Sequence, residues 1–138
     1  METVIALLRE KNRQLEKFYW VNEQELINFG AGNFDTVEEF YQARECLLEK
    51  ISAIDSHLEP ESQIIKGEIS ASQKAEIEAL LRSKDELVKA ILAQDLQILE
   101  YIEREKSNII RELKATANAK KAMSAYAKSE RMKHLDQE

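Results

Sequence analysis

The chain has 138 residues, of which 33% are charged and 43% are hydrophobic, a balance that is typical of folded domains and excludes a disordered chain. Its formal net charge of −6 argues against a general nucleic-acid-binding protein. No stretch approaches the apolar length of a membrane-spanning helix, so no membrane insertion is expected.

A first helix is predicted from Glu2 to Phe29, because large apolar residues recur there at spacings of three, four and seven. This seam consists of Ile5, Leu8, Leu15, Tyr19, Leu26 and Phe29. Asn12 and Asn22 interrupt it, and they have two interpretations: they fix the register inside a helix pair, or they lie at the solvated edge of the seam. In the cluster Phe18-Tyr19-Trp20, one helical turn points three side chains in different directions, so at least one leans outward.

The next predicted element is a second helix that runs to about Leu58 and is antiparallel to the first. The intervening Gly30-Ala31-Gly32-Asn33 is typical of a helix C-cap followed by left-handed conformations, and so short a turn indicates a helical hairpin. Asp35 or Thr36 caps the second helix, since each has a glutamate three residues later. The buried face of this helix is predicted to be Val37, Phe40, Leu47, Ile51, Ile54 and Leu58.

Pro60 and Gly67 indicate a loop from Glu59 to Ile69. Three of its side chains are expected to turn inward, namely Ile64, Ile65 and Ile69. Ser70 and Gln73 then form a candidate capping box at the start of a third helix that continues at least to Leu113. The predicted seam of this helix is Ile77, Leu81, Val88, Ile91, Ile98, Ile102, Ile109 and Leu113, backed by Leu80, Leu87, Leu99 and Ile110.

The predicted fold is therefore all-α: an antiparallel helical hairpin plus one long third helix, together a three-helix bundle. The bundle is expected to span residues 1–113, followed by a Lys/Ala-rich helical tail at residues 114–138. As an alternative, this tail forms a short fourth helix.

The third predicted helix is much longer than the hairpin that covers it. At the rise of an α-helix, the first two helices would be about 42 and 35 Å long and the third at least about 65 Å. The hairpin therefore ends near residues 93–96, and beyond that point the apolar residues keep their helical period without a cover: Ile98, Leu99, Ile102, Ile109, Ile110 and Leu113. Soluble monomers seldom expose such a face, so we expect it to bind a helix of a partner protein. A second copy of the chain and a folded-back tail are the alternative covers.

Catalytic chemistry is not expected from this sequence. The carboxylates lie on solvated helix faces, and no catalytic triad order or Gly-rich phosphate loop is present. His57 and His134 are far apart and the single cysteine is Cys46, so the spacing predicts no metal site and no cofactor. A lone cysteine and an acidic N-terminus without a secretory pattern favour the cytoplasm.

The tail differs from the rest of the chain in charge. Residues 114–138 carry six basic and three acidic residues, which leaves a net charge of −9 on the remainder. Residues 120–128 have high helix propensity but a thin apolar stripe, in which Met123 and Tyr126 are the large side chains. This segment is either a fraying helix end or a docking segment, with lysines that steer it to an acidic partner.

Two parts of the sequence resemble the small flagellar export chaperones of the FlgN and FliT type. The first is the opening helix with Gly32-Asn33-Phe34-Asp35 and then Arg44-Glu45-x-Leu47-Leu48-x-x-Ile51; the second is Lys120-Lys121-Ala122-Met123-x-Ala125-Tyr126. The resemblance implies a cytoplasmic helical bundle that holds the C-terminal helical region of a late export substrate, either a hook–filament junction protein or the filament cap. Such a chaperone prevents premature assembly and delivers its substrate to the export gate.

The resemblance also implies roles for particular residues. Tyr126 matches a late tyrosine that is linked to docking at the export gate protein, and Met123 lies beside it. The surface that takes the substrate helix corresponds to the stretch from Ile98 to Leu113. The tail has fewer hydrophobic residues than the family pattern, and no residue distinguishes a hook-associated substrate from the filament cap. The rival interpretations are a structural coiled-coil homodimer and a helical regulator that sequesters a partner protein.

Overall fold

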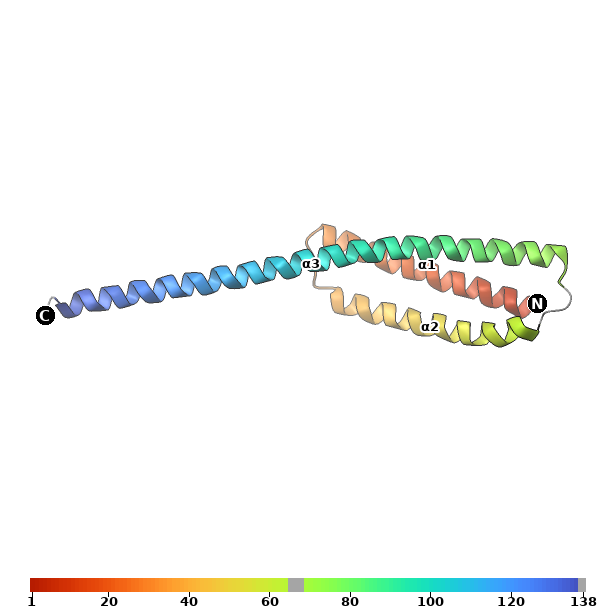
Figure 1. The fold of residues 1–138 in the computed structure, drawn as a ribbon, viewed down its shortest axis with the longest axis horizontal. Helices are drawn as coiled ribbons and strands as arrows, with labels where there is room; N and C mark the ends of the chain where they lie inside the picture. The colour runs from red at the N-terminus through yellow and green to blue at the C-terminus, as the bar shows by residue number, and fades with distance from the viewer. Residues whose placement is uncertain (65–68, 137–138) are drawn as a thin grey trace. The chain divides into compact units, whose positions relative to one another are not determined.

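The computed structural model of the chain describes residues 1–64 and 69–136, with side chains for 1–62 and 69–132. These residues form three helices, α1 (Glu2–Gly30), α2 (Val37–Ile64) and α3 (Ala71–Asp136), and no strand occurs among them (Figure 1). The fold is all-α with three helices, as predicted. The contacts of the chain fall into two compact units, Met1–Leu99 and Glu100–Glu138. The predicted division at residue 113 stays a prediction.

The turn between α1 and α2 is a Schellman motif built on Gly32. The N–H of Asn33 donates to the carbonyl of Asn28 at 2.9 Å, and the N–H of Gly32 donates to the carbonyl of Phe29 at 3.0 Å. Gly32 has a φ of +79°, the left-handed conformation that this motif requires. The rings of Phe29 and Phe34 then stack across the turn with centroids 4.7 Å apart. The predicted C-cap is confirmed, and Gly32 alone in the described residues has the positive φ.

We expect Gly32→Ala to lower the free energy of unfolding by about 1 kcal/mol, because a side chain with a Cβ is strained at positive φ. Apart from Gly32 itself and its two chain neighbours, no heavy atom lies within 4 Å of the added Cβ, so the strain of the backbone is the whole expected effect. Gly30→Ala is the matched control: Gly30 is helical, so alanine there should be neutral or slightly stabilising. Thermal unfolding followed by circular dichroism measures both. Equal effects of the two substitutions would contradict the assignment.

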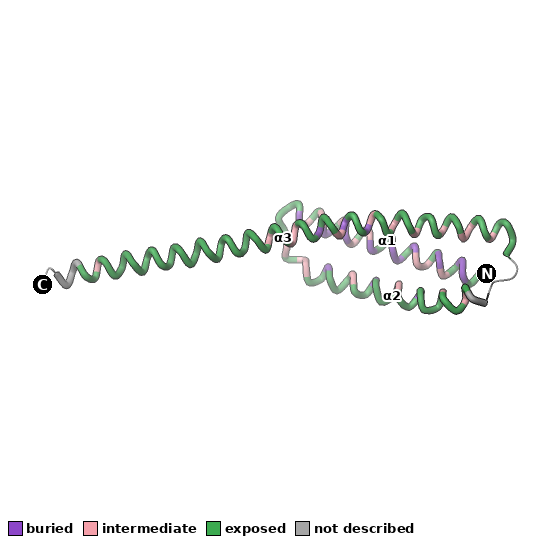
Figure 2. Tube along the Cα trace, in the orientation of Figure 1, coloured by how far each residue is buried: buried purple, intermediate pink, exposed green. Residues whose placement is uncertain are grey.

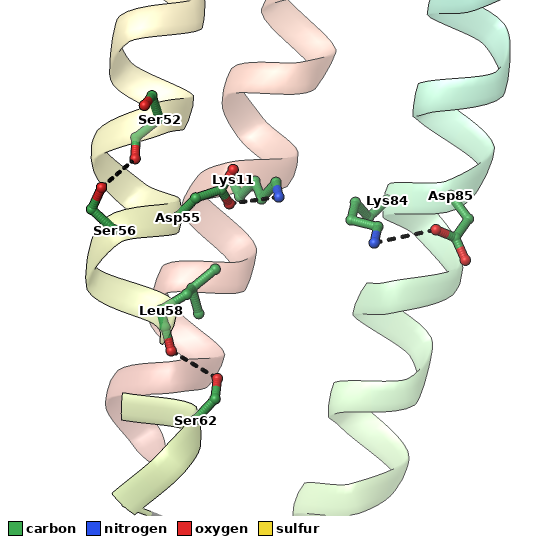
Figure 3. A network of polar contacts seen from close by, with 8 residues as sticks. All are labelled: Lys11, Ser52, Asp55, Ser56, Leu58, Ser62, Lys84 and Asp85. Atoms are coloured by element: carbon green, nitrogen blue, oxygen red, sulfur yellow. Dashed lines mark hydrogen bonds and ion pairs between the residues drawn. The ribbon is translucent and has the colours of Figure 1, made fainter. Parts of the chain in front are cut away.

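The helix α2 begins after Thr36, as predicted, but it ends later than the sequence indicated. The N–H of Phe40 donates to the carbonyl of Thr36 at 3.0 Å, while the Thr36 hydroxyl donates to the Glu25 carboxylate of α1 at 2.9 Å. The end predicted near Leu58 is wrong, because α2 continues through Pro60 to Ile64. Proline removes one N–H donor, and in this last part of α2 the Ser62 hydroxyl donates to the Leu58 carbonyl at 2.7 Å (Figure 3).

Three loop residues before α3 were predicted to turn inward, and the structure describes the side chain of one of them, Ile69. Ile69 is exposed, so the expectation that it turns inward is wrong. The Ile64 side chain and all of Ile65 lie outside the described residues.

The capping box at the start of α3 is confirmed. The N–H of Gln73 donates to the Ser70 hydroxyl at 3.1 Å, and the N–H of Ser70 donates to the Gln73 side-chain oxygen at 3.3 Å. From there α3 is one helix of 66 residues, so the described tail belongs to α3 and the alternative of a separate fourth helix is wrong.

The core of the first unit lies between α1, α2 and the first part of α3 (Figure 2). Its centre is the cluster Leu15, Phe18, Leu47 and Ile91, against which Tyr19, Val21, Ile51 and Leu87 pack. The predicted faces of α1 and α2 point inward: each of their seam residues is buried or partly buried. Trp20 is the member of the aromatic cluster that leans outward.

The inward face of α3 differs from its predicted seam. Leu81 and Val88 are exposed, whereas Leu80 and Leu87 are partly buried and Gln94 is buried. The sequence did not indicate this rotation, because the true inward face includes polar residues that an apolar pattern passes over. Large aliphatic side chains consequently remain on the outside of α3.

Candidate protein-binding surface

Buried polar contacts set the position of α3 against α1. The Asn12 amide donates to the Leu80 carbonyl at 3.0 Å, and the Asn22 amide donates to the Gln94 side-chain oxygen at 3.1 Å. Gln94 in turn donates to the Tyr19 carbonyl at 3.1 Å. Both asparagines are buried, so they lie inside the helix packing and not at its solvated edge. Such pairs fix register, because any slide of α3 would leave buried polar groups without partners.

Ion pairs connect α2 to the other two helices of the first unit. Lys11 of α1 contacts Asp55 of α2 at 2.6 Å (Figure 3), and Arg44 of α2 contacts Asp95 of α3 at 3.2 Å. The Arg44 guanidinium also lies over the rings of Phe18 and Phe40, at 4.9 and 5.2 Å from their centroids. Arg44 therefore joins all three helices.

An apolar groove follows the outside of the first unit between α2 and α3. We call it the α2–α3 groove; it encloses about 220 Å³ and is lined by Leu15, Phe18, Arg44, Leu48, Ile51, Val88, Ile91, Leu92 and Asp95. Its rim is apolar on both sides, since Leu48 of α2 is 52% exposed and Leu92 of α3 is 58% exposed. Leu96 and Leu99 continue the exposed stripe along α3. The sequence did not indicate this groove, because Leu48 and Leu92 belong to none of the predicted apolar seams and Val88 was expected to be buried.

The residues predicted to bind a partner differ in their exposure. Ile98 is 2% exposed and belongs to the core of the first unit, so its assignment to a binding surface is wrong. Its neighbour Leu99 lies on a different side of α3 and is 55% exposed. One residue step rotates a helix by about 100°, which is enough to separate a core residue from a surface residue.

The second unit carries the remaining predicted residues. Ile102 is partly exposed, and three others are exposed on the same helix: Ile109, Ile110 and Leu113. We call these four side chains the distal apolar face. After Glu105, every residue of α3 whose side chain is described is exposed except Glu130, which is partly exposed. Within the second unit the distal apolar face therefore has no described segment that covers it (Figure 2).

Met123 and Tyr126 also lie in the second unit, one helical turn apart, and both side chains are exposed. Lysines surround them at positions 120, 121 and 128. This arrangement leaves contact area free beside positive charge. Their assignment to docking at an export gate stays a prediction.

No group of three or more His, Cys, Asp or Glu side chains in the described residues is placed to hold a metal ion. None of the helices in the described ranges is both long and apolar enough to cross a bilayer.

Comparisons with known proteins give no indication of what this surface binds. No protein-family model, curated protein or solved structure matches the chain.

Proposed function

We propose that this protein is a cytoplasmic chaperone of flagellar type III export, which binds a helix of its substrate along the distal apolar face. The observation that carries the proposal is the exposure of Ile109, Ile110 and Leu113 on a helix of the second unit. Side chains of this size gain roughly 1.5–3 kcal/mol each when they are fully buried, so a chain that exposes several of them has a strong drive to bind.

The mechanism is mutual masking. An amphipathic helix from the C-terminal region of the substrate packs its apolar stripe against the distal apolar face, and each surface removes the other from water. While it is bound, the substrate helix is unavailable for assembly. The charged residues that flank the face, such as Arg111 and Glu112, remain in water and set orientation more than affinity.

Docking at the export gate is assigned to the end of α3. Tyr126 and Met123 offer exposed contact area, and the lysines around them favour an acidic partner surface. This separation leaves the substrate and the gate protein on different stretches of one helix. The resemblance to the FlgN and FliT type supports the assignment of Tyr126.

The test is co-expression of the chain with tagged C-terminal segments of the two hook–filament junction proteins and of the filament cap from the same genome. We expect a stable one-to-one complex with one of these segments. No complex with any of them, together with a tight self-dimer of the chain, would overturn the proposal in favour of a structural coiled coil. A complex with a transcription factor in its place would favour the regulator.

Substitutions that introduce a negative charge locate the binding surface of the chain within that complex. Ile109→Glu and Leu113→Glu should each weaken binding by about 30-fold or more, because a carboxylate would be buried in an apolar contact. Ile27→Glu is the matched control, since Ile27 is an exposed isoleucine on a different helix, α1. Far-UV circular dichroism checks that all three variants stay folded. Full-affinity binding by the first two variants would show that the distal apolar face is not the site.

A further inference from the structure

The distal apolar face continues into a positively charged stretch on the same side of α3. Residues on this side follow one another in steps of three or four: Ile110, Leu113, Ala117, Lys120, Ser124 and Lys128. Steps of this size keep side chains on one side of a helix. All six residues are exposed, and the last three line one shallow hollow on the helix surface. We call Lys120, Ser124 and Lys128 the basic extension.

The positive charge of this stretch is not neutralised along the helix. Residues 106–129 contain six basic residues and one acidic residue, a net charge of +5. The acidic residue is Glu112, and it lies one step of about 100° around the helix from Leu113, off the side that carries the basic extension. The surface of the second unit is therefore apolar over one stretch and positive over the next, with no carboxylate between them.

We propose that the distal apolar face and the basic extension together bind one helix of a partner protein, in which an apolar stripe is followed on the same side by Asp or Glu residues. This inference rests on the proposed function, since it assigns the chemistry of the helix that the distal apolar face binds. From Ile102 to Lys128 the surface extends about 39 Å along α3, so the partner helix needs about 26 residues. Complementary charge then selects this helix among apolar helices in general.

The position of the lysines favours a protein helix over an anionic membrane or a nucleic acid. A helix that lies in a membrane surface carries its basic residues on the polar face. Here Lys120 and Lys128 continue the side of Leu113, so the side that would enter the bilayer carries the charge. A phosphate backbone would attract the lysines but would leave the distal apolar face uncovered.

The same lysines oppose the pairing of α3 with a second copy in parallel register. That pairing would set Lys120 and Lys128 beside their own equivalents, and like charges at such positions are unfavourable. Tyr126 lies two residues after Ser124, about 200° around the helix, so a helix bound along the basic extension leaves Tyr126 accessible. One stretch of α3 can thus contact the substrate on one side and the export gate on the other.

Peptide binding to the full-length chain tests the proposal. The probes are labelled helical peptides of about 26 residues with leucines along one side of one half. In the other half the same side carries Glu in one probe and Gln in the second. Each probe is made with its polar half first and with its polar half last, since the partner can lie antiparallel or parallel to α3. Fluorescence anisotropy measures the dissociation constants.

We expect the Glu probe, in at least one of the two orders, to bind about 10-fold more tightly than the Gln probe, because each exposed ion pair contributes a few-fold. The difference should shrink in about 0.5 M sodium chloride, which screens exposed charges. Lys120→Glu should weaken the Glu probe by about 10-fold and leave the Gln probe nearly unchanged.

Arg111→Glu is the matched control for Lys120→Glu. It makes the same change in net charge on the same helix, but Arg111 lies about 200° around α3 from Leu113 and so faces away from the distal apolar face. Both residues are exposed, so both variants are expected to keep the helical content of the parent. Binding of the Glu probe should be nearly unchanged by Arg111→Glu.

Several results would overturn the inference. Equal binding of the Glu and Gln probes, or no binding of either, would show that the basic extension does not select the partner. Equal losses in Lys120→Glu and Arg111→Glu would show that only net charge matters. Tighter binding of phosphatidylserine vesicles or of a single-stranded RNA than of the Glu probe would assign the surface to a different class of partner.

The co-expression experiment separates this inference from the proposed function. An export complex that survives Lys120→Glu at full affinity would overturn the inference alone. Selective binding of the Glu probe, with no complex formed by any export segment, would support the acidic helix as partner and overturn the export role.

Discussion

Replacing Ile98 by alanine is expected to lower the free energy of unfolding by about 3 kcal/mol. Ile98 is among the most deeply buried side chains described, at 2% exposed, so truncation would leave a cavity in the packing of α3 in the first unit. Loss of transfer free energy and the cavity together cost roughly 2–5 kcal/mol at such positions. For a domain whose whole stability is of order 5–15 kcal/mol, this is a large fraction.

The adjacent residue provides the control for this prediction. Leu99→Ala removes a similar side chain from the same helix, but Leu99 is mostly exposed, so its stability should change by less than about 0.5 kcal/mol. Urea unfolding followed by circular dichroism measures both variants. Similar losses of stability for the two variants would mean that α3 does not pack through Ile98.

Replacing Asn22 by leucine is expected to destabilise the protein by about 2 kcal/mol. The change removes the donor to Gln94, whose side-chain oxygen would stay buried without a partner. It also removes the weaker 3.3 Å contact from Asn22 to Asp95. Thermal unfolding of the variant gives the magnitude of the loss.

The double variant Asn22→Leu/Gln94→Leu should recover much of that loss. With both amide side chains replaced by leucine, neither leaves a buried donor or acceptor without a hydrogen bond, and apolar packing takes the place of the polar contact. The Asn22 Oδ1 atom has no hydrogen-bond partner in the described part of the structure, so one buried acceptor of this polar pair already lacks a hydrogen bond in the parent protein. A double-mutant cycle should therefore give a coupling energy of about 1–3 kcal/mol between the two residues. A double variant that is as unstable as the sum of the single variants would show that the pair does not act as a unit.

Local chemistry determined much of the fold. The Gly32 turn and the Ser70–Gln73 capping box act over a few residues, so the sequence alone located both the hairpin turn and the start of α3. The inward faces of α1 and α2 also followed from periodicity, because each helix carries one dominant apolar stripe. The end of α2 was missed because a proline close to a helix end removes only one hydrogen bond, which tertiary packing can offset.

The candidate surfaces depended on tertiary structure. Large aliphatic side chains occupy more than one side of α3, so periodicity could not say which side packs inward. Placement of α3 against α1, through Asn22 and Gln94, decided that Ile98 enters the core while Leu99 and Leu92 stay outside. The α2–α3 groove depends on the same placement, because its walls come from residues far apart in the sequence, such as Leu48 of α2 and Leu92 of α3. The sequence by itself thus determined the helices and the presence of surplus apolar residues, whereas only the packing of the three helices decided which of those residues are available to a partner.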